Sequence, residues 1–181
     1  PIIMNIKGYQ ILLRILIHHP LAEIVFVHSK SNSGKKIYDV HDDLFGDTDL
    51  MFSDYFHNQV DVVFLCVAHG ESKELAKQFD KSIKIIDLSQ DFRLISDGNS
   101  FVYGLPELNR EVIKTAQHIA NPGCFATAIQ LALLPLAEKK LLQSDVHITC
   151  TTGSTGAGQS LSETSHFTWR QNNLSVYKAF T

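Results

Sequence analysis

The chain has 181 residues, of which 44% are hydrophobic and 19% are charged, and its formal net charge is −3. A chain of this length buries roughly 70% of its unfolded surface, so we expect it to fold without disulfide bonds or structural metals. No basic excess points to nucleic acid, the apolar runs are too short to span a bilayer, and the first residues lack a signal-peptide pattern, so we expect a cytoplasmic protein.

The first part of the chain predicts a helix between two strands. Residues 1–6 are expected to form a short strand, and residues 10–17 are apolar on nearly all sides, as in a buried helix. This helix should end before Pro20, because the residue before a proline avoids helical backbone angles. Residues 23–28 are β-branched and aromatic and predict a buried parallel strand. The acidic residues 37–54 show no clear period, so we expect loops there.

The rest of the chain continues this alternation. Strongly apolar strands are predicted at residues 61–67 and 83–88, with a short helix at 71–79 between them. Further strands are expected at residues 117–120 and 146–152. Alternating strands and helices predict an α/β protein with a parallel sheet, and in such sheets ligands bind beyond the carboxyl ends of the strands.

Polar or glycine-rich loops follow most of the predicted strands. Because the carboxyl ends of parallel strands meet at one edge of the sheet, these loops together predict a binding site. Any sheet also needs polar turns, so one polar loop is weak evidence, and the prediction depends on several such loops at the same edge. They contain Ser29 and Ser31, His69 and Gly70, Ser89 and Asp91, Cys124, and the glycine-rich stretch at 153–158.

The cysteines show no pattern of a disulfide framework or a zinc site. Cys66, Cys124 and Cys150 are widely spaced and odd in number, and the sequence has no Cys-x-x-Cys pair or cysteine–histidine cluster. This usage favours a reducing compartment, and we expect no metal site.

Cys124 stands where an Asn-Pro-Gly turn is predicted to become a helix. Apolar residues recur at helical spacing over residues 125–140, which places Cys124 in the first turn. Pro122 restricts one backbone angle, and we expect Gly123 to adopt a conformation that a side chain would forbid. The unpaired N–H groups and positive dipole end of a helix N-terminus favour a thiolate, which nucleophilic catalysis needs. A small buried core cysteine is the alternative interpretation.

Residues 153–160, GSTGAGQS, nearly match the phosphate-binding loop GxxxxGK[ST] and follow a predicted strand. Gln159 replaces the lysine that would reach nucleotide phosphates, so we expect no nucleoside triphosphate hydrolysis. The backbone N–H groups of such a loop can still bind an anion, and a plain flexible turn is the alternative interpretation.

Four motifs together resemble those of one enzyme family. They are NPGCFATA at residues 121–128, DLSQDFRL at 87–94, YGLPELNRE at 103–111 and TTGSTGAGQ at 151–159. From about Gly8 to its end, the chain resembles the N-acetyl-γ-glutamyl-phosphate reductases of the semialdehyde dehydrogenase superfamily. The resemblance implies NADPH-dependent reductive dephosphorylation of N-acetylglutamyl 5-phosphate to the semialdehyde in arginine biosynthesis, with Cys124 as the nucleophile that forms a thioester.

The resemblance also implies a domain organisation and a set of partners. Residues 1–123 would form a Rossmann-like parallel-sheet domain that binds the dinucleotide. Residues 124–181 would begin an α+β substrate and dimerisation domain of the semialdehyde dehydrogenase type. Members of the family assemble as homo-oligomers, so we expect a dimer or tetramer with a small acyl phosphate as substrate, and neither a nucleic acid nor a membrane as partner.

Site residues are carried over where this sequence matches the family. Asn121, Gly123 and Arg93 resemble residues of the substrate site, Glu107 lies in a matching motif, and Lys30 offers a positive charge for the ribose 2′-phosphate. The residues that resemble contacts to NADP(H) are Gly8, Tyr9, Ser29, Ser31, His69, Gly70, Ser154, Gly156 and Ala157.

The chain departs from the family pattern near both of its ends. Its first turn has the single glycine Gly8 where the family has a GxxGxxG-like phosphate cradle, so we expect either missing residues or weak NADP binding there. The family's acid–base histidine is expected beyond Thr181, since His166, the nearest candidate, does not match its motif. We therefore expect low activity from this chain alone.

The alternatives to an N-acetyl-γ-glutamyl-phosphate reductase are aspartate-semialdehyde dehydrogenase, a lysine-pathway acyl-phosphate reductase and a nucleotide-binding module without activity.

Overall fold

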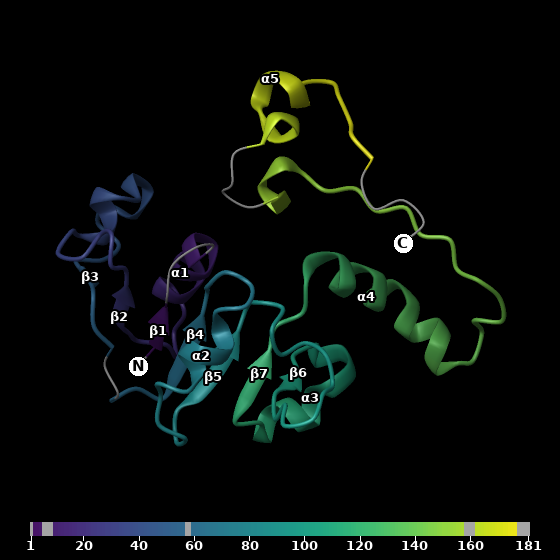
Figure 1. Ribbon diagram of the computed structural model, residues 1–181, viewed down its shortest axis with the longest axis horizontal. Coiled ribbons are helices and arrows are strands. Elements are labelled where there is room, and N and C mark those ends of the chain that lie inside the picture. The colour runs from purple at the N-terminus through teal and green to yellow at the C-terminus, as the bar shows by residue number, and fades with distance from the viewer. Residues whose placement is uncertain (1, 5–8, 57–58, 158–161, 177–181) are drawn as a thin grey trace. The chain divides into compact units, whose positions relative to one another are not determined.

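Within the described residues, seven strands form one sheet in the order β3-β2-β1-β4-β5-β7-β6, and every pairing in it is parallel. This computed structural model describes residues 2–4, 9–56, 59–157 and 162–176 (Figure 1). The predicted parallel α/β sheet is therefore confirmed. The strands are β1 (Ile2–Met4), β2 (Ile24–His28), β3 (Phe52–Ser53), β4 (Val62–Leu65), β5 (Lys84–Asp87), β6 (Val102–Tyr103) and β7 (His118–Ala120).

Helices connect most of the strands, as the alternating pattern predicts. The first helix ends at Ile17, before Pro20, and another begins at Pro106, where a proline suits the first helical position because its missing N–H is not needed. Among the described residues, no helix combines the length and apolar character needed to cross a membrane. The α-helices are α1 (Tyr9–Ile17), α2 (Ser72–Ala76), α3 (Pro106–Thr115), α4 (Cys124–Glu138) and α5 (Phe167–Arg170), and 3-10 helices occupy Ile37–Asp39, Asp42–Leu44, Ser154–Ala157 and Glu163–Ser165.

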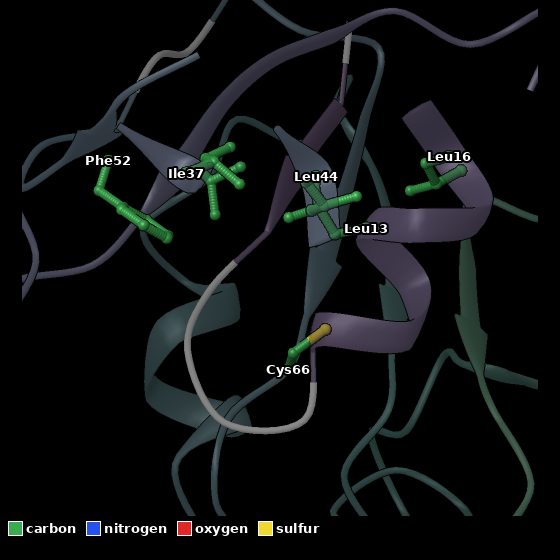
Figure 2. Packing of buried hydrophobic residues seen from close by; sticks show 7 residues of the cluster. Leu13, Leu16, Ile37, Leu44, Phe52 and Cys66 are labelled. Atoms are coloured by element: carbon green, nitrogen blue, oxygen red, sulfur yellow. The ribbon is translucent and has the colours of Figure 1, made fainter. Parts of the chain in front are cut away.

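The sheet buries apolar side chains on both faces. Successive residues of β2 point to opposite faces, so Val27 packs with Leu13 and Leu16 of α1, whereas Phe26 packs with Val63 and Leu65. Figure 2 shows Leu13 and Leu16 on α1, with Leu44 and Cys66 in the same cluster. Burial of both faces explains why these strands are continuous apolar runs rather than alternating ones.

The chain divides into two compact units, Pro1–Val146 and His147–Thr181, and each is described by itself. The first unit contains the whole sheet and α4, which has no buried residue although it is apolar on most sides. The strand predicted at residues 146–152 is wrong, because these residues form neither helix nor strand. A strand needs a neighbour for its backbone N–H and C=O groups, and none of the described strands pairs with this segment.

Candidate active site

The loops that follow β4, β5 and β7 lie next to one another, because these three strands are neighbours in the sheet (Figure 1). The strand order reverses between β1 and β4, and ligands of open parallel sheets bind at the carboxyl ends beside such a reversal. Of the two residues assigned to the first turn, Tyr9 begins α1 and Gly8 lies outside the described residues. The candidate site is therefore built from loops on consecutive strands.

The turn at residues 121–124 joins β7 to α4, and we call it the nucleophile turn after the role predicted for Cys124. Cys124 is the first residue of α4 and is exposed, so the predicted helix start is confirmed. The carbonyl of Gly123 accepts hydrogen bonds from the N–H of Thr127, at 2.9 Å, and from its hydroxyl, at 3.0 Å. The backbone N–H groups ahead of Thr127 in this first turn point to the same end of α4 as the thiol.

The expected conformation of Gly123 is wrong, and the structure gives another reason for a glycine. Its φ of −73° and ψ of 154° are open to any residue. A Cβ at this position would instead lie 2.9 Å from Nη1 of Arg93. Arg93 cannot easily move away, because its Nε donates to the carbonyl of Asn121 at 2.8 Å and its Nη2 to that of Leu88 at 2.9 Å. Close approach of a guanidinium explains the glycine.

The loop at residues 68–72 follows β4, and we call it the cofactor loop after the role predicted for His69 and Gly70. Gly70 has a φ of +93°, a left-handed conformation in which glycine carries no steric penalty. A Cβ at Gly70 would meet no atom within 4 Å, so the edge of the sheet is open there. His69 is exposed, and its Nδ1 accepts the N–H of Gln90 at 3.1 Å. This loop lies beside the reversal of strand order, where open parallel sheets bind ligands.

The loop after β2 presents one buried and one exposed serine. Ser29 is fully buried, and its hydroxyl accepts the N–H of Asn32 at 3.2 Å, so it shapes the loop. Ser31 and Lys30 are exposed beside it. His28, the last residue of β2, is buried against Phe56, and burial, followed by the nearby charge of Lys30, lowers the pKa of its imidazole. The cation of Lys30 and the hydroxyl of Ser31 have the chemistry that binds a phosphate.

The second unit holds the glycine-rich stretch. Ser154, Gly156 and Ala157 belong to one 3-10 helix, Ser154–Ala157, where the sequence predicted a glycine-rich loop able to bind an anion or, alternatively, a flexible turn. A Cβ at Gly156 would lie 2.5 Å from Oγ1 of Thr152, so close packing within this unit requires the glycine. His166 is exposed in the same unit, and its Nδ1 lies 2.8 Å from the hydroxyl of Thr168.

Several contacts at the site had no counterpart in the sequence reasoning. The carboxyl of Asp87 is fully buried and accepts the hydroxyl protons of Ser72, at 2.5 Å, and Ser89, at 2.8 Å. A polar residue at the end of an apolar strand is the only sequence signal for this cluster. The hydroxyl of Tyr103 also donates to Gln130 of α4 at 3.0 Å, whereas Glu107 is exposed in the first turn of α3.

The accessibility of the three cysteines gives a first prediction. We expect iodoacetamide at neutral pH to modify Cys124 about two- to fivefold faster than Cys150, which is the size of a helix-dipole effect on an exposed charge. Cys66 should stay unmodified, since its burial, followed by the nearby Asp87 carboxylate, raises the pKa of its thiol to about 12. Peptide mass spectrometry over time measures the three rates, and labelling in urea provides the control. Equal, slow labelling of all three in the folded chain would contradict a reactive Cys124.

Comparisons with protein-family models cover most of the chain. Residues 8–116 match the family model described as the semialdehyde dehydrogenase NAD-binding domain. Residues 124–181 match that of the semialdehyde dehydrogenase dimerisation domain. The nucleophile turn thus lies at the junction of the two matches.

Curated relatives share most of this sequence over about half of their own length. A protein of Azobacteroides pseudotrichonymphae is 60% identical over 173 residues, which are 94% of this chain and 54% of the relative. One of Flavobacterium johnsoniae is 58% identical over 175 residues, with coverages of 93% and 54%. One of Christiangramia forsetii is 56% identical over 171 residues, with coverages of 93% and 53%. All three are named N-acetyl-gamma-glutamyl-phosphate reductase.

Solved structures support the fold at much lower identity. Aspartate semialdehyde dehydrogenase II of Vibrio cholerae, in a complex with ASA, superposes with a TM-score of 0.64 at 19% identity, covering 87% of this chain and 48% of that one. The aspartate semialdehyde dehydrogenase of Francisella tularensis gives 0.56 at 15% identity, covering 77% and 41%. Identities this low carry the fold and no further argument.

Proposed function

The chain belongs to the semialdehyde dehydrogenase family, and on that premise we propose that it supplies the nucleophile and the cofactor loops of an N-acetyl-γ-glutamyl-phosphate reductase. The reaction would be reduction of N-acetylglutamyl 5-phosphate to N-acetylglutamate 5-semialdehyde with release of phosphate, a step of arginine biosynthesis. One observation carries the proposal. Cys124 is exposed at the start of α4, at the carboxyl edge of the sheet, in a chain 60% identical to a relative named for this activity.

In the first step, Sγ of Cys124 attacks the carbonyl carbon of the acyl phosphate. The new C–S bond forms as the bond from carbon to the phosphate oxygen breaks, and phosphate leaves with that electron pair and the thiol proton. A thioester on Cys124 remains, so one difficult substitution is divided into two easier steps. We assign to the N–H groups at the start of α4 the stabilisation of the oxyanion that forms during the attack.

We assign Asn121, Gly123 and Arg93 to the substrate side of this site. The guanidinium of Arg93 lies against Gly123, one residue from the nucleophile, and two of its nitrogens are engaged by backbone carbonyls. The positive charge is thus held in a fixed place against Gly123, the residue before Cys124. An arginine so placed suits a phosphate group as it approaches and departs.

Residues at the same edge would hold the cofactor, NADP(H). We assign His69 and Gly70 to the nicotinamide side, and Ser29, Ser31 and Lys30 to the ribose 2′-phosphate, with Gly8 and Tyr9 near the pyrophosphate. Ser154, Gly156 and Ala157 lie in the second unit, which is described by itself, and their contact with NADP(H) stays a prediction from the resemblance. The reduced nicotinamide, when bound, supplies the reducing equivalent that converts the thioester to an aldehyde. The exposed Lys30 supports a preference for the phosphorylated dinucleotide.

We further propose that the domain boundary falls between residues 123 and 124, so that the nucleotide-binding domain ends at the nucleophile. The two family matches, which end at 116 and begin at 124, support this division. The match to a dimerisation domain supports a homo-oligomer. A cytoplasmic location is supported by Cys66, Cys124 and Cys150, which are all free.

The first half-reaction tests this proposal directly. After incubation with N-acetylglutamyl 5-phosphate, we expect one acyl adduct per chain, located on Cys124 by peptide mass spectrometry, and an equal amount of released phosphate. Hydroxylamine should remove the adduct, as it does for a thioester. Absence of an adduct, or equal acylation by aspartyl phosphate, would reject the assigned substrate.

A further inference from the structure

Residues 87–93, which we call the connection, comprise the last residue of β5 and the loop that follows it. The connection lies between the cofactor loop and the nucleophile turn. The geometry points to a positioning function for its hydrogen-bond network, formed by buried Asp87, Ser89 and Ser72 and half-buried Asp91. This network holds the cofactor loop at a fixed place relative to Cys124. The inference rests on the proposed function, because it assigns these residues to the reaction that Cys124 starts.

Asp91 binds the cofactor loop through both of its carboxylate oxygens. Oδ1 accepts the N–H of Gly70 at 2.7 Å, and Oδ2 accepts the N–H of Ser72 at 3.0 Å. Gly70 is the residue with the left-handed conformation, so the carboxylate fixes the loop where the backbone is least constrained by sterics. Two bonds from one carboxylate set both the place and the orientation of the loop.

Asp87 holds Asp91 in place through hydrogen bonds to the hydroxyl of Ser89. The hydroxyl of Ser89 accepts the N–H of Asp91 at 3.0 Å and donates to Oδ2 of Asp87 at 2.8 Å. Oδ1 of Asp87 accepts the hydroxyl proton of Ser72, at 2.5 Å, and the N–H of Ser89, at 3.2 Å. Ser72 is therefore bound twice, by its N–H and by its hydroxyl. A fully buried carboxylate that meets only neutral donors costs free energy to bury, and full use of its oxygens offsets that cost.

The same connection binds the nucleophile turn from its other side. The carbonyl of Asp87 accepts the N–H of Asn121 at 2.7 Å, and Nε of Arg93 donates to the carbonyl of Asn121 at 2.8 Å. Nη2 of Arg93 returns to the carbonyl of Leu88 at 2.9 Å. Asn121 is thus held through both its N–H and its C=O by residues of the connection.

One short connection therefore holds the loop for the reducing group and the turn for the thioester. A reduction requires the two reacting groups at a fixed separation, and small misplacements lower the rate strongly. Asp91 contacts neither Cys124 nor the nucleophile turn in any hydrogen bond of the described residues, so it acts through other residues. We describe it as a positioning residue.

The test compares Asp91→Asn with a matched control, Asp80→Asn. Asp80, like Asp91, accepts two hydrogen bonds, here from the N–H and the hydroxyl of Ser82, but it lies just before β5, at the opposite edge of the sheet from Asp91. Two quantities are measured on folded protein. They are the ratio of Cys124 to Cys150 alkylation without cofactor, and the dissociation constant for NADP⁺ from fluorescence titration.

For Asp91→Asn we expect the alkylation ratio to fall by about twofold or more and the dissociation constant to rise about tenfold, as for a lost charged hydrogen bond. Asp91→Glu, which keeps the carboxylate, should recover most of both changes, and Asp80→Asn should match the parent. If Asp91→Asn does not fold, Ser72→Ala serves in its place. An unchanged alkylation ratio in the folded variant, or the same change in Asp80→Asn, would overturn the inference. The alkylation ratio is measured without cofactor, so it tests the inference independently of the proposed function. If the parent binds no NADP⁺ and forms no acyl adduct, only the proposed function is contradicted.

Discussion

The Cys124→Ser variant should release phosphate from N-acetylglutamyl 5-phosphate at least about 10³-fold more slowly than the parent, as for loss of other catalytic nucleophiles. A serine hydroxyl at the start of α4 is almost fully protonated at neutral pH and lacks the nucleophilicity of a thiolate. The helix N-terminus and Arg93 remain in place, so the variant isolates the contribution of the sulfur. A stopped-flow phosphate assay over the first turnover measures the effect.

Cys150→Ser is the matched control for this experiment, because Cys150 is also free and exposed. It should release phosphate at the rate of the parent. A burst that persists in Cys124→Ser and disappears in Cys150→Ser would transfer the function of nucleophile to Cys150. Phosphate release at the parent's rate in both variants would indicate that the measured phosphate arises from hydrolysis in solution.

The Leu13→Ala variant should lower the free energy of unfolding by about 2–5 kcal/mol, the usual cost of an alanine at a fully buried leucine. Leu13 is 0% exposed and lies in the cluster that joins α1 to β2 and the segment around Leu44 (Figure 2). Loss of its side chain leaves a cavity that the strand cannot close. Urea denaturation followed by circular dichroism measures the change.

Ile11→Ala provides the control on the same helix. Ile11 is 72% exposed, so its truncation removes little buried surface, and we expect a change below about 0.5 kcal/mol. An equal decrease of the free energy of unfolding in both variants would contradict the assignment of Leu13 to the buried face and Ile11 to the exposed face of α1.

Apolar runs predicted the centre of the sheet well. Strands β2, β4 and β5 contribute buried side chains to the core, and each contains a run of apolar residues (24–27, 62–65 and 85–86), a signal that does not depend on distant residues. The sequence reasoning missed β3 and β6, which have two residues each and form only because a neighbour pairs with them. The opposite error at residues 146–152 has the same origin, since an apolar run becomes a strand only where a partner exists.

The site shows the same division between local and distant causes. The start of α4 at Cys124 follows from spacing within the sequence, and it is confirmed. The reason for Gly123 was not predictable, because the group that a side chain would meet, the guanidinium of Arg93, comes from another loop. Asp87 and Ser72 also lie far apart in the sequence, and no local pattern indicates the hydrogen bond between them.

The bonded connection at residues 87–93 also limits how the length of this chain can change. Its two ends are bonded to Asn121 and its middle to Gly70, so one added or deleted residue there would pull Asp91 or Arg93 from its partners. Just beyond it, Leu94 and Ile95 are exposed, and Gly98 turns the chain with a φ of +79°. The fold should therefore tolerate insertions, deletions and grafted peptides after Ile95 but not before Leu94. This surface turn is the place for a probe or tag that leaves the site intact.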